Sequence, residues 1–200
     1  AAISACEKGG QWEKALELLR KMQERGVTPN RISFNSAISA CEKAGEWEQA
    51  LVLLDEVQQS SSGPDIISFS AAISACSRSG QSAKALQIFD DMHLSGVEAK
   101  TLAGNRTKER GTEGDGFEPD VIYYGAAISA CEKGGQWEKA LVILDEMRQN
   151  QYISLDVTSF NGAMRACIRG GQWARALALL DQIKQEPEVT PDIVSFNTAI

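Results

Sequence analysis

The five cysteines of this sequence have the widest chemical range of its residues, since a thiolate can bind a metal, form a disulfide or attack a substrate. They stand singly at positions 6, 41, 76, 131 and 167, never as a Cys-x-x-Cys pair, and their number is odd. A zinc ribbon or a disulfide framework is therefore not expected. The single histidine, His93, has no second imidazole or cysteine pair beside it, which argues against a metal or catalytic centre.

Motifs of catalysis are also missing from the sequence. It contains no P-loop, Gly-x-Ser-x-Gly, His-Glu-x-x-His or Gly-x-Gly-x-x-Gly pattern. Acidic pairs such as Asp55 and Glu56 are sequence neighbours, so they point to different sides of a helix and cannot form an acid–base dyad. We therefore expect no enzyme activity, cofactor, metal or small-molecule substrate in this chain.

Composition places the 200 residues among ordinary soluble chains, with 43% hydrophobic and 24% charged residues. The net charge of −7 should repel nucleic acid and anionic membranes. The longest uncharged stretch, 66–77, is too short for the ~20 apolar residues of a membrane span, so no membrane partner is expected. The first residues resemble neither a signal peptide nor a transit peptide, and we expect any targeting peptide to lie outside this chain.

The spacing of the cysteines reveals an internal repeat. Successive cysteines are 35, 35, 55 and 36 residues apart, and each lies in a nearly identical segment, such as AAISACEKGGQWEKALELL and SAISACEKAGEWEQALVLL. The units are a partial repeat at 1–30, repeats at 31–65, 66–120, 121–156 and 157–192, and the start of a further repeat at 193–200. This organisation suggests a fragment of a longer array.

Each repeat is predicted to form two helices. In the repeat 31–65, Ser33 can serve as the N-cap of a helix whose apolar stripe includes Phe34 and Cys41; we call this first helix of a repeat helix A. Gly45 ends it, and a second amphipathic helix, helix B, begins near Trp47. A turn ending in Pro-Asp or Pro-Asn then leads to the next repeat. Stacked helix pairs of this kind build an all-α solenoid.

The third repeat carries a 20-residue insertion at about 96–115, which is polar and rich in glycine. We expect a flexible surface loop there. An alternative is that the insertion interrupts the junction between repeats and splits the solenoid into two blocks.

These features resemble the pentatricopeptide repeat family. The resemblance rests on the Phe-Asn start of helix A (Phe34-Asn35, Phe160-Asn161 and Phe196-Asn197), the glycine between the helices, the Ala-Leu of helix B and the Pro-Asp ending, and it covers nearly the whole chain. Tetratricopeptide repeats are the most similar class, but they carry a Trp in the first helix, whereas here it opens the second. The resemblance implies a right-handed superhelix that binds single-stranded RNA, one base per repeat.

It further implies a role in organellar RNA processing, stability, editing or translation, in chloroplast or mitochondrion. The base-reading residues would be the fifth of each repeat (Asn35, Ser70, Gly125, Asn161 and Asn197) and the last (Asn30, Asp65, Asp120, Asp156 and Asp192). The second residues would sandwich the bases: Ile32, Ile67, Ile122, Thr158 and Val194.

The family's pairs predict a preferred RNA of about four nucleotides. Asn35 with Asp65 and Asn161 with Asp192 match its pair for uracil, Ser70 with Asp120 favours guanine, and Gly125 offers no side chain. The expected sequence is U-G-N-U. A basic residue near the end of each helix A is a candidate contact for the RNA phosphates, although cations also favour this position because of the helix dipole: Lys8, Lys43, Arg78, Lys133 and Arg169.

A second function stays open, that of a tetratricopeptide-like scaffold that binds proteins and no RNA. The net charge of −7 and the missing side chain at Gly125 favour it. The recurring Asn and Asp positions favour RNA, because a scaffold has no reason to keep one polar pair in register. Much of the negative charge is predicted on helix B, so the surface of helix A is expected to be less acidic than the whole chain.

Overall fold

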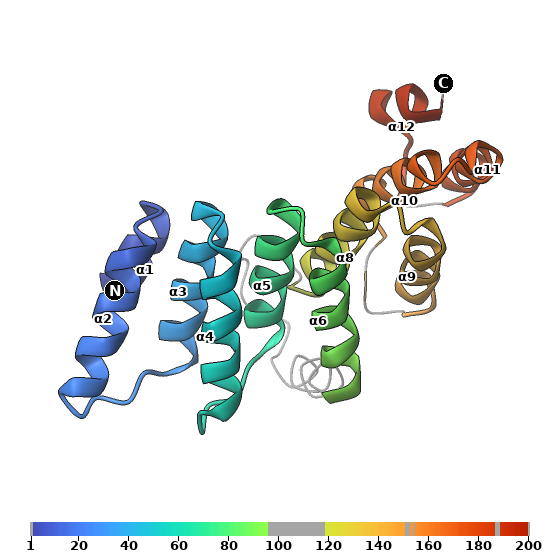
Figure 1. Cartoon of the computed structure of the whole chain (residues 1–200). Coiled ribbons are helices and arrows are strands. Elements are labelled where there is room, and N and C mark those ends of the chain that lie inside the picture. Colours follow the sequence, from blue (N-terminus) through green and yellow to red (C-terminus); the bar gives the residue numbers. More distant parts are fainter. Residues whose placement is uncertain (1, 96–118, 151–152, 154, 187–188, 200) are drawn as a thin grey trace. The chain divides into compact units, whose positions relative to one another are not determined.

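The structure, a computed structural model, describes residues 2–95, 119–150, 153, 155–186 and 189–199. The chain divides into two compact units, residues 1–112 and 113–200, and the boundary falls inside the repeat 66–120. The regular structure of the described residues is entirely helical, which confirms the predicted all-α class (Figure 1). None of these helices is both long and apolar enough to span a bilayer. The insertion predicted at 96–115 lies outside the described residues.

The described residues of the first unit form three helix pairs, which lie in the segments 1–30, 31–65 and 66–120 that are predicted as repeats. The helices are α1 (Ala2–Lys8), α2 (Trp12–Glu24), α3 (Arg31–Ala44), α4 (Trp47–Gln59), α5 (Ile66–Arg78) and α6 (Ser82–Ser95). Helix α3 packs between α1 and α5, so the helices A form one layer, and α2 and α4 each pack against the helix A that follows (Figure 1). This is the pairwise stacking expected of a solenoid.

The second unit repeats the arrangement. Its helices are α8 (Pro119–Gly134), α9 (Trp137–Gln149), α10 (Val157–Arg169), α11 (Trp173–Ile183) and α12 (Ile193–Ala199). Helix α10 packs against α8 before it and α12 after it, and also against α9 and α11. Helices α8, α10 and α12 are therefore the helices A of this unit.

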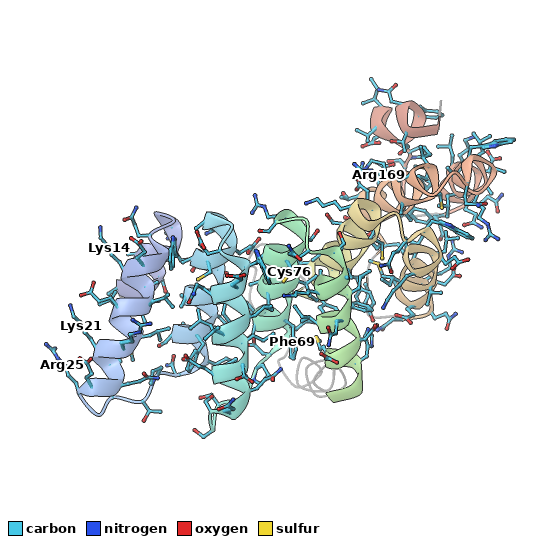
Figure 2. The ribbon with its side chains drawn as sticks, viewed as in Figure 1. Lys14, Lys21, Arg25, Phe69, Cys76 and Arg169 are labelled. Atoms are coloured by element: carbon cyan, nitrogen blue, oxygen red, sulfur yellow. The ribbon has the colours of Figure 1, made fainter. Side chains whose placement is uncertain are left out.

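Small and aromatic side chains of helix A fill the interior. Phe69 and Cys76 lie among the packed helices in Figure 2, and both are almost completely buried. Burial raises the pKa of Cys41 and of Cys76 to about 11, so these thiols stay protonated at neutral pH. The sequence predicts Cys41 on the apolar stripe of helix A, and the cysteines at 41, 76, 131 and 167 are all fully buried.

The glycines between the helices end helix A as predicted. Gly45 follows α3 with φ +81°, and the N–H of Glu46 donates to the carbonyl of Cys41. A left-handed residue with this hydrogen bond is a common helix ending, and glycine adopts it without a steric penalty. The equivalent glycines also have positive φ: Gly10, Gly80, Gly135 and Gly171.

Two of the tryptophans that open helix B, Trp47 and Trp137, contact the next repeat. The ammonium of Lys84 lies 4.1 Å from the ring centre of Trp47, and the guanidinium of Arg175 lies 4.6 Å from that of Trp137. Each cation belongs to the following helix B, so these contacts join neighbouring pairs. Trp173 has no such cover among the described residues and is 69% exposed.

Candidate nucleic-acid interface

One face of each helix A carries the predicted binding residues. In α3 these are Ile32, Asn35 and Lys43. Together with Ser39, which was not predicted to bind, they are spaced by three, four and four residues, which places all four along one side of the helix. We call this side the helix A face, defined by the second, fifth, ninth and thirteenth residues of a repeat. The opposite stripe, which contains Phe34, is buried.

Apolar side chains are exposed on the helix A face at the second position. Ile32 is 69% exposed and Ile67 is 47% exposed, and Val194 and Thr158 are also exposed, while Ile122 is half-buried. Exposed branched aliphatic side chains at one repeated position offer flat apolar contact to a ligand. This exposure is compatible with the predicted sandwiching of bases.

The last residue of a repeat caps the next helix A. The side-chain oxygen of Asn30 accepts from the N–H of Ser33 at 3.0 Å, and Asp65 and Asp156 accept in the same way three residues on. The prediction that Ser33 is the N-cap was therefore wrong. Ser33 lies inside α3, where its hydroxyl donates to Asn30 at 3.0 Å, because the extended backbone of Asn30 leaves its amide oxygen over the first turn.

The cap differs at α8. This helix begins at Pro119 and includes Asp120, so the expected Pro-Asp turn is the first turn of a helix here, where proline is well tolerated. The third position holds the buried Tyr123 instead of a serine. The side chain of Asp120 lies outside the described part of the structure. The predicted pairing of Asp120 with Ser70 therefore stays a prediction.

Asn35 and Asp65 form the first polar pair on this face. The amide nitrogen of Asn35 donates to both carboxylate oxygens of Asp65, at 3.0 and 3.2 Å. The hydroxyl of Ser68 donates to the amide oxygen of Asn35, and Arg31 lies 3.9 Å from the Asp65 carboxylate. The capping aspartate and its serine thus hold the asparagine amide in one orientation.

Asn161 and Asp192 form the second pair. The amide nitrogen of Asn161 donates to Asp192 at 3.1 Å, and Ser195 donates to the same carboxylate through its N–H at 2.8 Å and its hydroxyl at 2.9 Å. The backbone N–H of Ser195 and, after it, the Asn161 amide lower the pKa of Asp192. Asn161 is 3% exposed, and its amide oxygen is buried without a hydrogen-bond partner in the described part of the chain.

The other predicted fifth residues differ from these asparagines. The hydroxyl of Ser70 is buried and donates to the carbonyl of Ile66 at 2.6 Å, within its own helix. A Cβ built on Gly125 has no neighbouring atom within 4 Å, so this position faces open space. Asn197 is exposed on α12.

The predicted phosphate contacts pair with glutamates of the preceding repeat. Lys43 lies 3.2 Å from Glu7, and Arg78 lies 3.5 Å from Glu42. Arg169, labelled in Figure 2, lies 3.8 Å from Glu132. All of these cations lie near the C-terminal end of a helix A, a position where the helix dipole favours positive charge. The other two predicted phosphate contacts, Lys8 and Lys133, are exposed.

Sequence reasoning missed three groups of residues on or beside this face. They are the serines that support the caps, the glutamates that hold the cations, and Arg165, which pairs with Glu132 at 2.9 Å. Two signals were available, a serine three residues after the capping Asn or Asp, and a glutamate directly before the lysine in Cys-Glu-Lys. The serines lie three residues from the caps that they support. The partners of the glutamates, and Asn35 as the second partner of Ser68, are more than 30 residues away.

Comparison with known proteins agrees with this architecture. The PPR repeat family model matches residues 1–43, the PPR repeat model matches 32–61, 67–97 and 122–152, and the pentatricopeptide repeat domain model matches 149–200. Among curated proteins, none matches this chain.

Two similar solved structures come from one pentatricopeptide repeat protein. The crystal structure of PPR10 from maize is 21% identical with a TM-score of 0.62, over 98% of this chain and 25% of that one. The structure of PPR10 in complex with an 18-nt psaJ RNA element is 20% identical with a TM-score of 0.43, over 98% of this chain and 30% of that one. The present chain thus spans about a quarter of PPR10. With the matched repeats running along its length, the chain belongs to the pentatricopeptide repeat family.

Proposed function

We propose that this chain binds single-stranded RNA in a sequence-dependent way, with one base per repeat. The observation that carries the proposal is the recurrence of one polar pair, Asn35 with Asp65 and Asn161 with Asp192, each joining a helix A to the cap of the next. Family membership supports it. The protein would act as an adaptor in organellar RNA processing, stability, editing or translation by occupying a single-stranded site.

The chemistry of the pair suits the edge of a base. An asparagine amide offers both a donor and an acceptor, and uracil presents one N–H and two carbonyls. Because Asp65 and Ser68 hold the amide of Asn35 before any ligand arrives, binding would lose little side-chain entropy. Exposed Ile32 and Ile67 would supply apolar contact with the neighbouring bases.

Affinity of this chain should be modest. Base stacking contributes about 1–3 kcal/mol per base, and about four bases must offset an association cost of ~4–15 kcal/mol. The net charge of −7 adds no overall attraction. Selection would therefore depend on base contacts more than on bulk electrostatics.

The test measures binding of a labelled single-stranded RNA that contains U-G-N-U, and of variants changed at one base. Asn35→Ala should abolish the preference for the first U and leave the preference for the fourth, which Asn161 would read. Loss of one hydrogen bond predicts a cost of about 0.5–1.5 kcal/mol at that base. Fluorescence anisotropy across the RNA series gives the dissociation constants.

Gln87→Ala is the matched control, because Gln87 is an exposed amide on helix B, away from the helix A face. It should leave all preferences unchanged. If neither U matters to the wild-type chain, the base-reading proposal is wrong, and absence of any RNA binding would favour the protein-binding scaffold. Detection of the full-length protein in neither chloroplasts nor mitochondria would contradict the organellar role.

A further inference from the structure

A row of glutamates runs beside the cations of the helix A face. Glu7, Glu42 and Glu132 occupy the same position in their repeats, directly before the basic residue at the end of helix A. Each pairs with a cation of the following repeat, Glu7 with Lys43, Glu42 with Arg78, and Glu132 with both Arg165 and Arg169. The pattern occurs in both units, so it belongs to the repeat and not to one contact.

The glutamates lie deeper than their partners. The side chains of Glu7, Glu42 and Glu132 are 28%, 22% and 15% exposed, whereas those of Lys43, Arg78 and Arg169 are 44%, 61% and 55% exposed. An anion reaching the exposed cations therefore comes close to a carboxylate that is shielded from solvent. Screening by water and salt is weaker for such partly buried charges.

In the first unit, two glutamates of this row, Glu7 and Glu42, pair with two cations, Lys43 and Arg78. Burial raises the pKa of Glu42, while Arg78 and Lys43 oppose that shift and Glu7 adds to it. The four groups thus interact as one line of alternating charge in the first unit. Burial disfavours the Glu42 carboxylate more than its two cations favour it, and a phosphate placed among them would add a further negative charge.

We propose that Glu7, Glu42 and Glu132 limit the attraction of the helix A face for RNA phosphates and so leave selection to the base contacts. The inference rests on the proposed RNA binding. It assigns these glutamates a positioning role, because they act through the cations and need not touch the RNA. Competition between carboxylate and phosphate for one cation is the physical mechanism.

The experiment compares the wild-type chain with the double variant Glu42→Gln and Glu132→Gln. Glutamine keeps the size and loses the charge, so the variant should bind U-G-N-U RNA about fivefold tighter, and a mismatched RNA tighter by a similar factor. The plot of log K against log salt should become steeper by ~0.7 for each phosphate newly contacted. A merely structural role for the glutamates would not steepen this slope.

The control is Glu48→Gln with Glu138→Gln, which removes two charges from exposed positions in the first turn of helices B. It should leave both affinity and slope near the wild-type values. Circular dichroism during thermal unfolding verifies that each variant folds. If the double variant does not fold, the single variant Glu42→Gln takes its place in the comparison.

The outcomes separate the two proposals. Tighter binding with a steeper slope, absent from the control, supports the role of the glutamates. Unchanged or weaker binding of the glutamine variant, while the wild-type chain binds RNA, overturns this inference alone. If neither protein binds RNA at any salt concentration, both proposals are wrong. An equal gain in the control variant would assign the effect to net charge and overturn the role of the row.

Discussion

At the scale of single residues, the helix A face depends on side chains that serve two neighbours at once. Asp65 and Asp192 cap the helix that follows them and accept a hydrogen bond from the asparagine of their own repeat. Ser68 likewise contacts both Asp65 and Asn35. A change at one of these positions therefore alters a helix end and a candidate base-reading amide together.

The titration of Asp192 depends on its hydrogen bonds with Ser195 and Asn161. The pKa of Asp192 is lowered because its ionised carboxylate accepts these hydrogen bonds. The stabilisation is therefore complete at pH values above the ordinary pKa of an aspartate, and it is lost as the pH falls through the lowered pKa. Asn161→Ala removes one donor, so the pKa of Asp192 should rise toward 3.8. Carboxyl NMR during a pH titration measures this, and Asn197→Ala is the control. An unchanged pKa in Asn161→Ala would contradict the pairing in solution.

At the scale of the elements, glycine marks both close contacts and open positions within helix A. Gly162 in α10 lies against Ile128 of α8, where an added Cβ would come within 2.7 Å of the isoleucine Cγ2. Gly125 in α8 has no neighbour within 4 Å of the same built atom. Two helical glycines in one unit thus have opposite packing environments.

This contrast predicts opposite effects of the same substitution. Gly162→Ala must displace the fully buried Ile128, so it should lower the free energy of unfolding by about 1–3 kcal/mol. Gly125→Ala replaces a flexible helical residue without a clash, so it should raise that free energy by up to ~1 kcal/mol. Urea denaturation of the two variants measures both. Equal effects would show that α8 and α10 pack less closely than described.

At the scale of the whole molecule, acidity and stacking are the dominant features. The net charge is −7, and three cations of the helix A face, Lys43, Arg78 and Arg169, form ion pairs with glutamates. Stacking gives each unit a continuous interior of small residues, and four of the five cysteines are completely buried in it. Cys6 of α1 is partly exposed.

Thiol reactivity therefore reports on the stacking. At pH 7 a maleimide reagent should modify Cys6 first, because it is accessible, whereas Cys41 and Cys76, with pKa values of about 11, are buried and almost fully protonated. Mass spectrometry after timed labelling identifies the modified residue, and labelling in denaturant should reach all five. Similar rates at Cys6 and Cys41 in the native protein would be incompatible with the buried layer.

The sequence by itself determined the repeats, the two helices in each and the apolar stripe of helix A, because these depend on periodicities within about 35 residues. Through the family resemblance it also predicted that Asn35 with Asp65 and Asn161 with Asp192 read bases, and this role stays a prediction. Only the tertiary structure decided that Asn30 and not Ser33 caps α3, that Ser70 bonds its own helix, and that the cations pair with glutamates. The cap and the Ser70 bond are local, but they depend on the backbone conformation of Asn30 and on the side-chain orientation of Ser70, which periodicity does not specify. The ion pairs join residues more than 30 positions apart, so they require the helices to be placed side by side.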